Sequence, residues 1–134
     1  MLDIKAVDHV GIRIRERARS TAFYQVLGFD LVKDAGFAQG HPIIMRHPSG
    51  VVLNLLGPSS VDEDHNILMD VEQTYTGITH VALQVGSLAA AKTFLAEAMI
   101  EITGQFSFGE MHAVFIRDPD RNVIELDAYE ALTD

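Results

Sequence analysis

The chain has 134 residues and a formal net charge of −9, and it contains no cysteine. This length suits one packed domain rather than two. The acidic charge argues against nucleic acid or an anionic membrane surface as a partner, and the lack of cysteine excludes disulfides, thiolate metal sites and a cysteine nucleophile. The sequence shows neither a signal-peptide pattern nor an apolar run of membrane-spanning length, so we expect a cytoplasmic protein.

The first half of the chain predicts the element order β-α-β-β-β. Residues 7–14 alternate between an apolar set on one face and His9, Gly11 and Arg13 on the other, as in a half-buried strand. A helical stripe follows and stops at Gly28, a residue suited to a left-handed position at a helix C-terminus. Further strands are expected near residues 31–34, 42–46 and 51–56.

A connector at residues 58–76 contains Pro58 and an acidic run at 62–64. It is longer than most loops in compact domains, so we expect it to cross from one half of the chain to the other. The predicted organisation is a single domain over residues 1–134, with one module at about 1–57 and a second at about 77–134. A module of this length would bury too little surface to be stable alone.

The second half predicts the same order of elements. Residues 78–85 form the expected first strand, and Ser87 is suited to cap the helix that follows. Phe106 to Glu110 are interpreted as a mobile loop near the entrance of a site. The apolar stripe of the helix is expected to be Leu88, Ala91, Phe94, Leu95 and Ala98, and later strands are expected near residues 102–105, 113–117 and 123–129.

The two halves are related by a sequence repeat with a fixed offset of 71 residues. The offset pairs His9 with His80 and Asn54 with Glu125. A duplicated fold with matched ligands predicts a metal site between its halves. The matching segments are 7–14 with 78–85, 45–48 with 116–119, and 52–55 with 123–126.

Three of the four matched positions carry good metal ligands. Two histidines and one carboxylate on one face leave coordination positions open for substrate or water. Glu125 lies between Ile124 and Leu126 in a predicted strand, where an unpaired buried charge would be costly. The pattern predicts that His9, His80 and Glu125 bind a divalent ion, which could be iron, nickel, zinc or manganese. The equivalent Asn54 is a candidate fourth ligand or substrate contact.

Three motifs resemble those of the vicinal oxygen chelate superfamily, which includes glyoxalases, bleomycin resistance proteins and dioxygenases. They are His-Val near the start of each first strand, Phe-Tyr-x-x-Leu-Gly-Phe at 23–29, and Asp-Pro-Asp-x-Asn-x-Ile-Glu-Leu at 118–126. The resemblance implies an α+β fold of two tandem βαβββ modules that form an open, U-shaped mixed barrel with helices outside. It also implies a homodimer that binds a small-molecule substrate, and it maps the metal ligands to His9, His80 and Glu125.

Within that superfamily, the resemblance favours a glyoxalase-like lyase or isomerase acting on a small, metal-chelated, oxygenated substrate. Glu125 would then be the catalytic base as well as a ligand. Arg13 matches the position of an arginine that contacts a substrate carboxylate in glyoxalase I, and guanidinium suits this role. Such enzymes usually have a glutamate where this chain has Asn54, so the assignment to this class stays open.

Two alternative functions follow from the same resemblance. Extradiol ring-cleaving dioxygenases use iron(II) held by two histidines and a glutamate, and they usually need a further acid-base histidine. His41 and His112, another pair at the 71-residue offset, are the candidates, although strand-end positions predict that both are exposed. The other alternative is a drug-binding resistance protein without enzymatic activity, which is compatible with the acidic charge but does not require the metal ligands.

Overall fold

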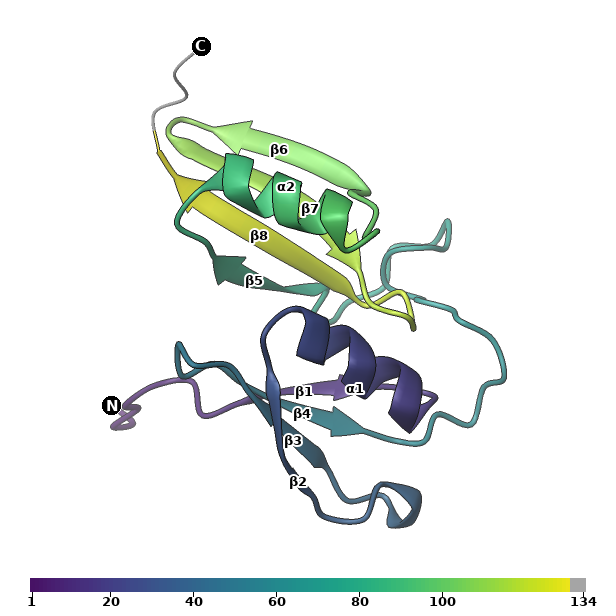
Figure 1. The fold of residues 1–134 in the computed structure, drawn as a ribbon. Helices are drawn as coiled ribbons and strands as arrows, with labels where there is room; N and C mark the ends of the chain where they lie inside the picture. The colour runs from purple at the N-terminus through teal and green to yellow at the C-terminus, as the bar shows by residue number, and fades with distance from the viewer. Residues whose placement is uncertain (131–134) are drawn as a thin grey trace. The chain divides into compact units, whose positions relative to one another are not determined.

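The computed structural model describes residues 1–130, which lie in two compact units, Met1–Asp64 and His65–Asp134. Each unit contains one α-helix and one four-stranded sheet that mixes parallel and antiparallel pairs (Figure 1). The boundary falls inside the expected connector. The α+β class and the order β-α-β-β-β in each half are therefore confirmed, and neither sheet closes into a barrel within its unit.

The first unit contains a sheet with the strand order β1-β4-β3-β2. Only the β1–β4 pair is parallel. A short 3₁₀ helix, Phe37–Gln39, lies between β2 and β3. The elements are β1 (Val10–Arg13), α1 (Arg17–Val26), β2 (Asp30–Asp34), β3 (Ile43–Arg46) and β4 (Val52–Leu56).

The predicted alternation of the first strand is confirmed. Ile12 is 8% exposed and Ile14 is fully buried, whereas Gly11 and Arg13 are exposed. Apolar residues of β3 and β4 join Ile12 and Ile14 in a core that also includes Tyr24 from α1. The chain turns after α1 at Gly28, whose φ of +103° lies in the left-handed region that glycine tolerates without strain.

The second unit repeats this arrangement with the strand order β5-β8-β7-β6. Again only the first pair, β5–β8, is parallel. The elements are β5 (His80–Gln84), α2 (Leu88–Glu97), β6 (Gly104–Phe108), β7 (Met111–Arg117) and β8 (Val123–Tyr129).

The interpretation of Phe106 to Glu110 as a loop is wrong. Phe106 and Phe108 belong to β6, where they pair in register with Ala113 and Met111 of β7. Only the two residues Gly109 and Glu110 form the turn between these strands. Aromatic residues are favoured in strands because they pack well on a pleated surface, and this preference outweighs the glycine nearby.

Helix α2 begins as the sequence predicts. The Ser87 hydroxyl accepts a hydrogen bond from the Ala90 N–H at 3.1 Å and so caps the helix. Leu88 and Leu95, seven residues apart, are the buried side chains of the stripe, and α2 packs against β7 and β8. Phe94 differs from the prediction because it is 44% exposed, at the margin of this stripe.

Ion pairs fix the connector to each unit. Asp64 accepts hydrogen bonds from Arg15 and Arg19 in the first unit, at 3.2 and 2.8 Å. Asp70 accepts hydrogen bonds from Arg117 and Arg121 in the second unit, at 3.0 and 2.7 Å. The hydrogen bonds from the two guanidinium groups, that of Arg121 first, lower the pKa of the Asp70 carboxyl to about 2.

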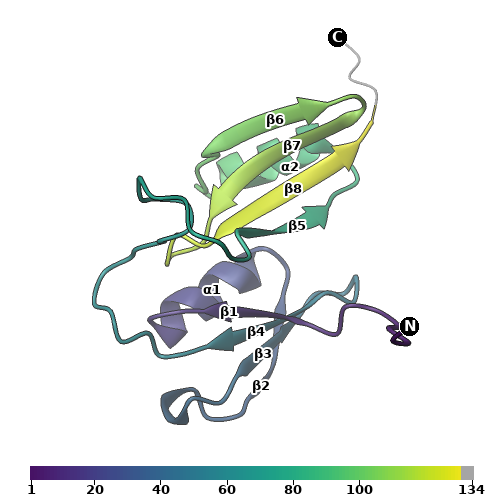
Figure 2. The same cartoon turned by 180° about the vertical axis from the view of Figure 1, so that it is seen from behind.

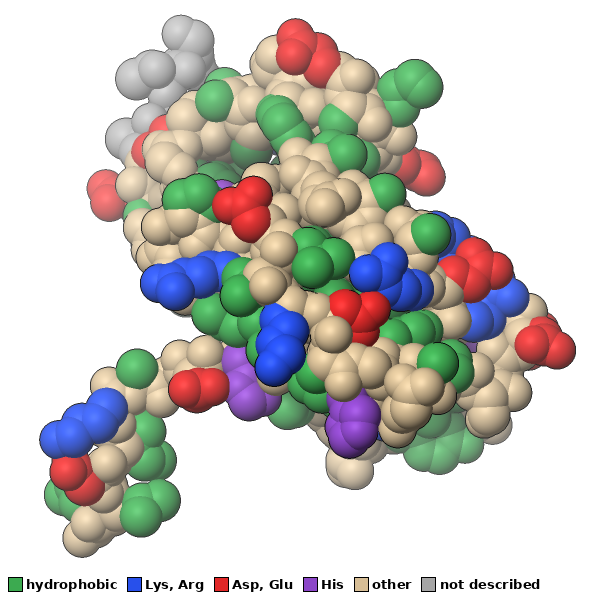
Figure 3. Space-filling model, turned by 60° about the horizontal axis from the view of Figure 1, so that its bottom comes forward, with side chains coloured by type: hydrophobic (Ala, Val, Ile, Leu, Met, Phe, Trp, Pro, Cys, Tyr) green, Lys and Arg blue, Asp and Glu red, His purple; other side chains and the backbone are tan. Residues whose placement is uncertain are grey.

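The first nine residues are exposed, and Figure 3 shows this N-terminal segment with its hydrophobic side chains standing away from the rest of the first unit. Within residues 1–130, no helix has the length and apolar character needed to cross a membrane.

Candidate metal and substrate site

The second sheet has one face covered by α2 and one open face, which Figure 2 presents toward the viewer. In-register residues of neighbouring strands point to the same side of a sheet. Three pairs of residues from β5 and β8 lie on the open side. They are His80 with Val123, Ala82 with Glu125, and Gln84 with Asp127. The strand alternation therefore brings one predicted ligand from β5 and one from β8 to the same face.

His80 and Glu125 lie in direct contact. The His80 Nε2 and Glu125 Oε1 atoms are 3.4 Å apart, with 36% and 13% of the two side chains exposed. The His80 Nδ1 atom is 2.8 Å from the Thr79 hydroxyl, which leaves Nε2 for the carboxylate. The ring of Phe115 packs edge-on against the imidazole, with 6.3 Å between ring centroids. The contacts with Thr79 and Phe115 orient the imidazole of His80 toward Glu125.

The separation of these two atoms fits a shared metal ion. Two ligands at about 2.1 Å from one metal lie about 3.0 Å apart in octahedral geometry and about 3.4 Å apart in tetrahedral geometry. The observed 3.4 Å is in that range. An imidazole nitrogen beside a carboxylate oxygen is also a donor set that iron, nickel, zinc and manganese accept.

Glu125 is an unusual carboxyl group in the metal-free protein. Burial raises its pKa to about 7, and a hydrogen bond and the negative charge of Asp127, two residues along the same face, act in the same direction. Asp127 is 9% exposed, and its Oδ1 atom is buried without a hydrogen-bond partner. A cation at this position would relieve both the repulsion and the cost of burial.

We expect the metal-free protein to lose stability as pH rises from about 4.5 to about 7. In this interval Glu125 ionises in the unfolded chain but keeps its proton in the folded protein. The folded state therefore binds more protons, and the free energy of unfolding falls as pH rises. The loss amounts to at most about 3 kcal/mol. Urea unfolding at several pH values should show this slope in the wild type but not in Glu125→Gln, and equal slopes would contradict the assignment.

The first sheet carries the other predicted site residues at equivalent places. Asn54 pairs with Gly11 across the parallel β1–β4 ladder, as Glu125 pairs with Ala82, and Arg13 pairs with Leu56. His9 immediately precedes β1, and its Nδ1 atom is 2.6 Å from the Asp8 carboxylate.

The structure thus brings together two of the predicted ligands, His80 and Glu125, in the second unit. His9, Asn54 and Arg13 belong to the first unit. Across residues 1–130, no group of three histidine, aspartate or glutamate side chains could hold a metal ion. The complete ligand set of two histidines and one glutamate therefore stays a prediction.

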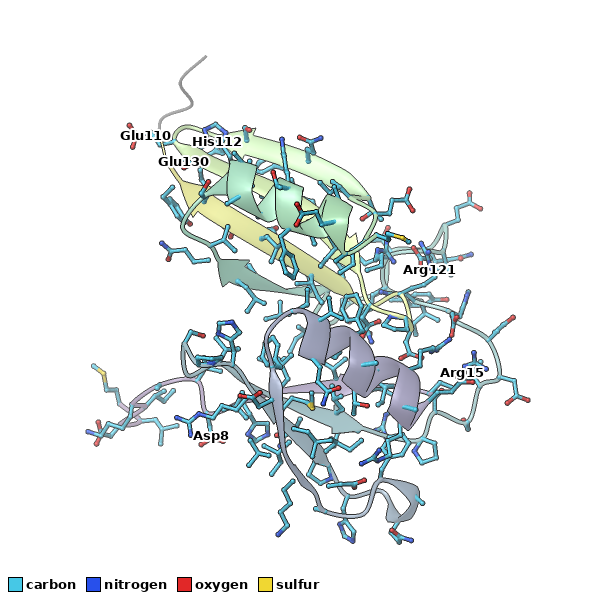
Figure 4. The ribbon with its side chains drawn as sticks, viewed as in Figure 1. Asp8, Arg15, Glu110, His112, Arg121 and Glu130 are labelled. Carbon is cyan, nitrogen blue, oxygen red and sulfur yellow. The ribbon has the colours of Figure 1, made fainter. Side chains whose placement is uncertain are left out.

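The expectation that His112 is exposed is wrong. His112 is 8% exposed and pairs with Ala128, so it points to the helix side of the sheet, opposite to Glu125. Its Nδ1 atom is 2.8 Å from the Ser107 hydroxyl. Figure 4 labels it at the end of the second sheet, near Glu110 and Glu130. His112 therefore cannot be an acid-base group beside the His80–Glu125 pair. His41 is exposed in the first unit, as expected.

The contact of Phe115 with His80 was not predicted from the sequence. A signal for it existed, because Phe115 matches Ile44 at the 71-residue offset, and Ile44 pairs with Asn54 in the first sheet. In the second sheet Phe115 pairs with Glu125 in the same way. The register of the duplicated sheets predicts a large side chain next to each position of the Asn54–Glu125 pair.

Two mixed sheets of the same topology, one of them with a histidine and a glutamate in contact on its open face, define a duplicated fold with a candidate metal site. Residues 6–126 match the family described as the Glyoxalase/Bleomycin resistance protein/Dioxygenase superfamily. The chain belongs to this superfamily, which confirms the resemblance. A comparison with curated protein sequences found no match.

Solved structures of several members share the fold. A glyoxalase family protein from Enterococcus faecalis is 21% identical, with a TM-score of 0.76 over 94% of this chain and 99% of the other. A lactoylglutathione lyase from Agrobacterium tumefaciens is 18% identical, with a TM-score of 0.69 over 95% and 96%. An antibiotic binding protein from Streptomyces sp. is 18% identical, with a TM-score of 0.73 over 97% and 100%.

Proposed function

We propose that the protein is a divalent-metal-dependent lyase or isomerase of the glyoxalase type, acting in the cytoplasm on a small, oxygenated substrate. The 3.4 Å contact between His80 Nε2 and Glu125 Oε1 carries this proposal. It places an imidazole nitrogen and a carboxyl oxygen on one open face at a separation that fits one ion. A binding protein without a metal has no need for this pairing.

Each predicted residue has a role in this reaction. His80 and Glu125 would hold the metal together with His9, and Asn54 would be a fourth ligand or contact the substrate. When bound, the ion would polarise two adjacent oxygens of the substrate as a Lewis acid. The Glu125 carboxylate removes a proton from the carbon next to those oxygens and returns it to the neighbouring position. Arg13 binds a carboxylate of the substrate through its guanidinium group.

The position of His112 removes one of the two candidate acid-base histidines for ring cleavage and leaves His41 of the first unit as the other. An extradiol dioxygenase needs an acid-base histidine near its metal, and His112 faces the opposite side of the sheet from Glu125. Isomerisation needs no such histidine, because a ligand carboxylate can move the proton.

Elemental analysis after anaerobic purification tests the proposed class. We expect nickel, zinc or another divalent metal together with turnover of the hemithioacetal of methylglyoxal and glutathione. Iron(II) with oxygen uptake on catechols would instead identify a dioxygenase. A protein that takes up none of iron, nickel, zinc and manganese would contradict the enzymatic proposal and favour a small-molecule binding protein.

We also propose that the protein is a homodimer, and a mixing experiment tests whether His9 and His80 from different copies build one site. His9→Ala and His80→Ala chains with different affinity tags are co-expressed, and dimers that carry both tags are isolated. A site shared between copies leaves one intact site in each mixed dimer, so metal binding returns at half the wild-type stoichiometry. A site within one chain leaves none. A monomer in light scattering would contradict the dimer.

A further inference from the structure

The open face of the second sheet continues beyond the His80–Glu125 pair in two further rows of side chains. The strand register defines these rows, because residues paired across β5, β8, β7 and β6 share a face. The row next to Glu125 holds Gln84, Asp127, Ala113 and Phe106, and the row after it holds Tyr129, Met111 and Phe108.

Three large aromatic side chains on these rows are exposed. Phe106 is 50% exposed, Tyr129 is 64% exposed and Phe108 is 76% exposed. We call these three residues the aromatic shelf. Neighbouring exposed aromatic side chains on one face commonly mark a surface that binds a ligand or a partner, since they bury a large apolar area on contact.

The row next to Glu125, which also holds Phe106 of the shelf, carries the negative charge of Asp127 and an acceptor without a hydrogen-bond partner. Asp127 is 9% exposed and its Oδ1 atom has no hydrogen-bond partner. Glu125 lies two residues before it on the same face. Arg117, the cation beyond Glu125 on this face, is paired with Asp70 at 3.0 Å. This charge disfavours an anionic group in the middle of a ligand and favours a neutral group with a donor.

The spacing of the rows sets the length of such a ligand. Two residues along a strand advance about 7 Å, and four advance about 14 Å. A molecule that reaches from Glu125 to the shelf is therefore elongated. A compact substrate of two or three carbons would leave the three aromatic side chains in water.

We propose that the substrate is an elongated molecule with two adjacent oxygens at one end, a neutral middle and a flat apolar group at the other end, and that the carboxylate assigned to Arg13 lies outside this middle part. The oxygens lie at the His80–Glu125 pair and the apolar group lies on Phe106, Phe108 and Tyr129. This inference rests on the proposed function for the oxygen end, whereas the shelf itself does not depend on a metal.

Hydroxamic acids of increasing length test the proposal, because they chelate metals through two adjacent oxygens. The probes are acetohydroxamic, benzohydroxamic and biphenyl-4-carbohydroxamic acid, titrated by calorimetry into zinc-loaded protein. We expect the biphenyl compound to bind about tenfold more tightly than the benzo compound, from burial of its second ring. Phe106→Ala or Phe108→Ala should remove this gain and leave the affinity for acetohydroxamic acid unchanged. Phe94→Ala, a phenylalanine of α2, should change neither and serves as the matched control.

A second measurement tests ligand binding by the aromatic shelf independently of the metal site. The neutral dye N-phenyl-1-naphthylamine is titrated into metal-free protein. Dye binding that falls at least about fivefold in Phe106→Ala and Phe108→Ala supports the shelf, even if no hydroxamate binds and the metal site is wrong. Equal affinity for the three hydroxamates, with dye binding unchanged in both variants, overturns the shelf. If Phe108→Asp dissociates a dimer, the three aromatic side chains contact a second copy of the chain. This result would also overturn the proposal that they bind the substrate.

Discussion

Replacing His80 with alanine is expected to weaken divalent-metal binding by at least about 100-fold, since it removes a direct ligand and not merely a residue that orients one. Glu125→Gln should weaken binding to a similar extent, because an amide oxygen is a poorer donor to a cation than a carboxylate. Competition with a chromophoric chelator, with zinc or nickel, measures both affinities.

Two features make this experiment specific. His80 is not part of the buried apolar core of the second unit, so its truncation should leave the fold intact. His65→Ala is the matched control, because His65 is an exposed histidine of the same unit. Near wild-type affinity in His80→Ala, with loss of affinity in His65→Ala, would place the metal elsewhere in the molecule.

Replacing Asp118 with alanine is expected to lower the free energy of unfolding by about 3 kcal/mol. Asp118 is 4% exposed and organises the turn that leads into β8. Its Oδ1 atom accepts hydrogen bonds from the N–H groups of Asp120 and Asn122, both at 2.9 Å, and its Oδ2 atom accepts one from the Asn122 side chain. Alanine would leave these donors without their acceptor. Urea or thermal unfolding measures the change.

A graded control accompanies this variant. Asn122→Ala removes the side-chain bond to Asp118 and keeps both backbone bonds, so it should cost about 1 kcal/mol. Because the turn sets where β8 begins, Asp118→Ala should also disturb the contact between His80 and Glu125. An unchanged unfolding midpoint in Asp118→Ala would contradict the prediction, because it would show that water replaces the carboxylate as acceptor without loss of stability.

The sequence was sufficient to predict the elements and the faces of the strands. Alternation in 78–85 and 123–129 assigned His80 and Glu125 to one side, and the structure confirms their contact. The period of two in a strand makes this inference robust, since a shift of one residue would bury the polar set. The duplication added the pairing of Asn54 with Glu125, which the identical registers of the two parallel strand pairs now support.

Other features depended on contacts that the sequence does not encode locally. His112 was expected to be an exposed residue just before a strand at 113–117. Strand β7 in fact begins at Met111, and the alternation of its side chains places His112 on the helix side. Phe106 to Glu110 were interpreted as a loop, yet pairing with β7 extends β6 to Phe108. In both cases the neighbouring strand decides the outcome. His9 belongs to the first unit and His80 to the second, and local sequence patterns do not encode how modules associate.

In β4 and β8, alternate residues face the core and the opposite side of the sheet, and this alternation affects how such proteins can change during evolution. Leu53 and Leu55 in the first sheet, and Ile124 and Leu126 in the second, all lie in cores. Asn54 and Glu125, between them, face the other way, and the two sheets tolerate either residue with the same topology. Side chains can therefore be exchanged at this position with little effect on folding. A gene duplication of this fold provides two copies of this position, so one copy can keep its side chain while the other changes.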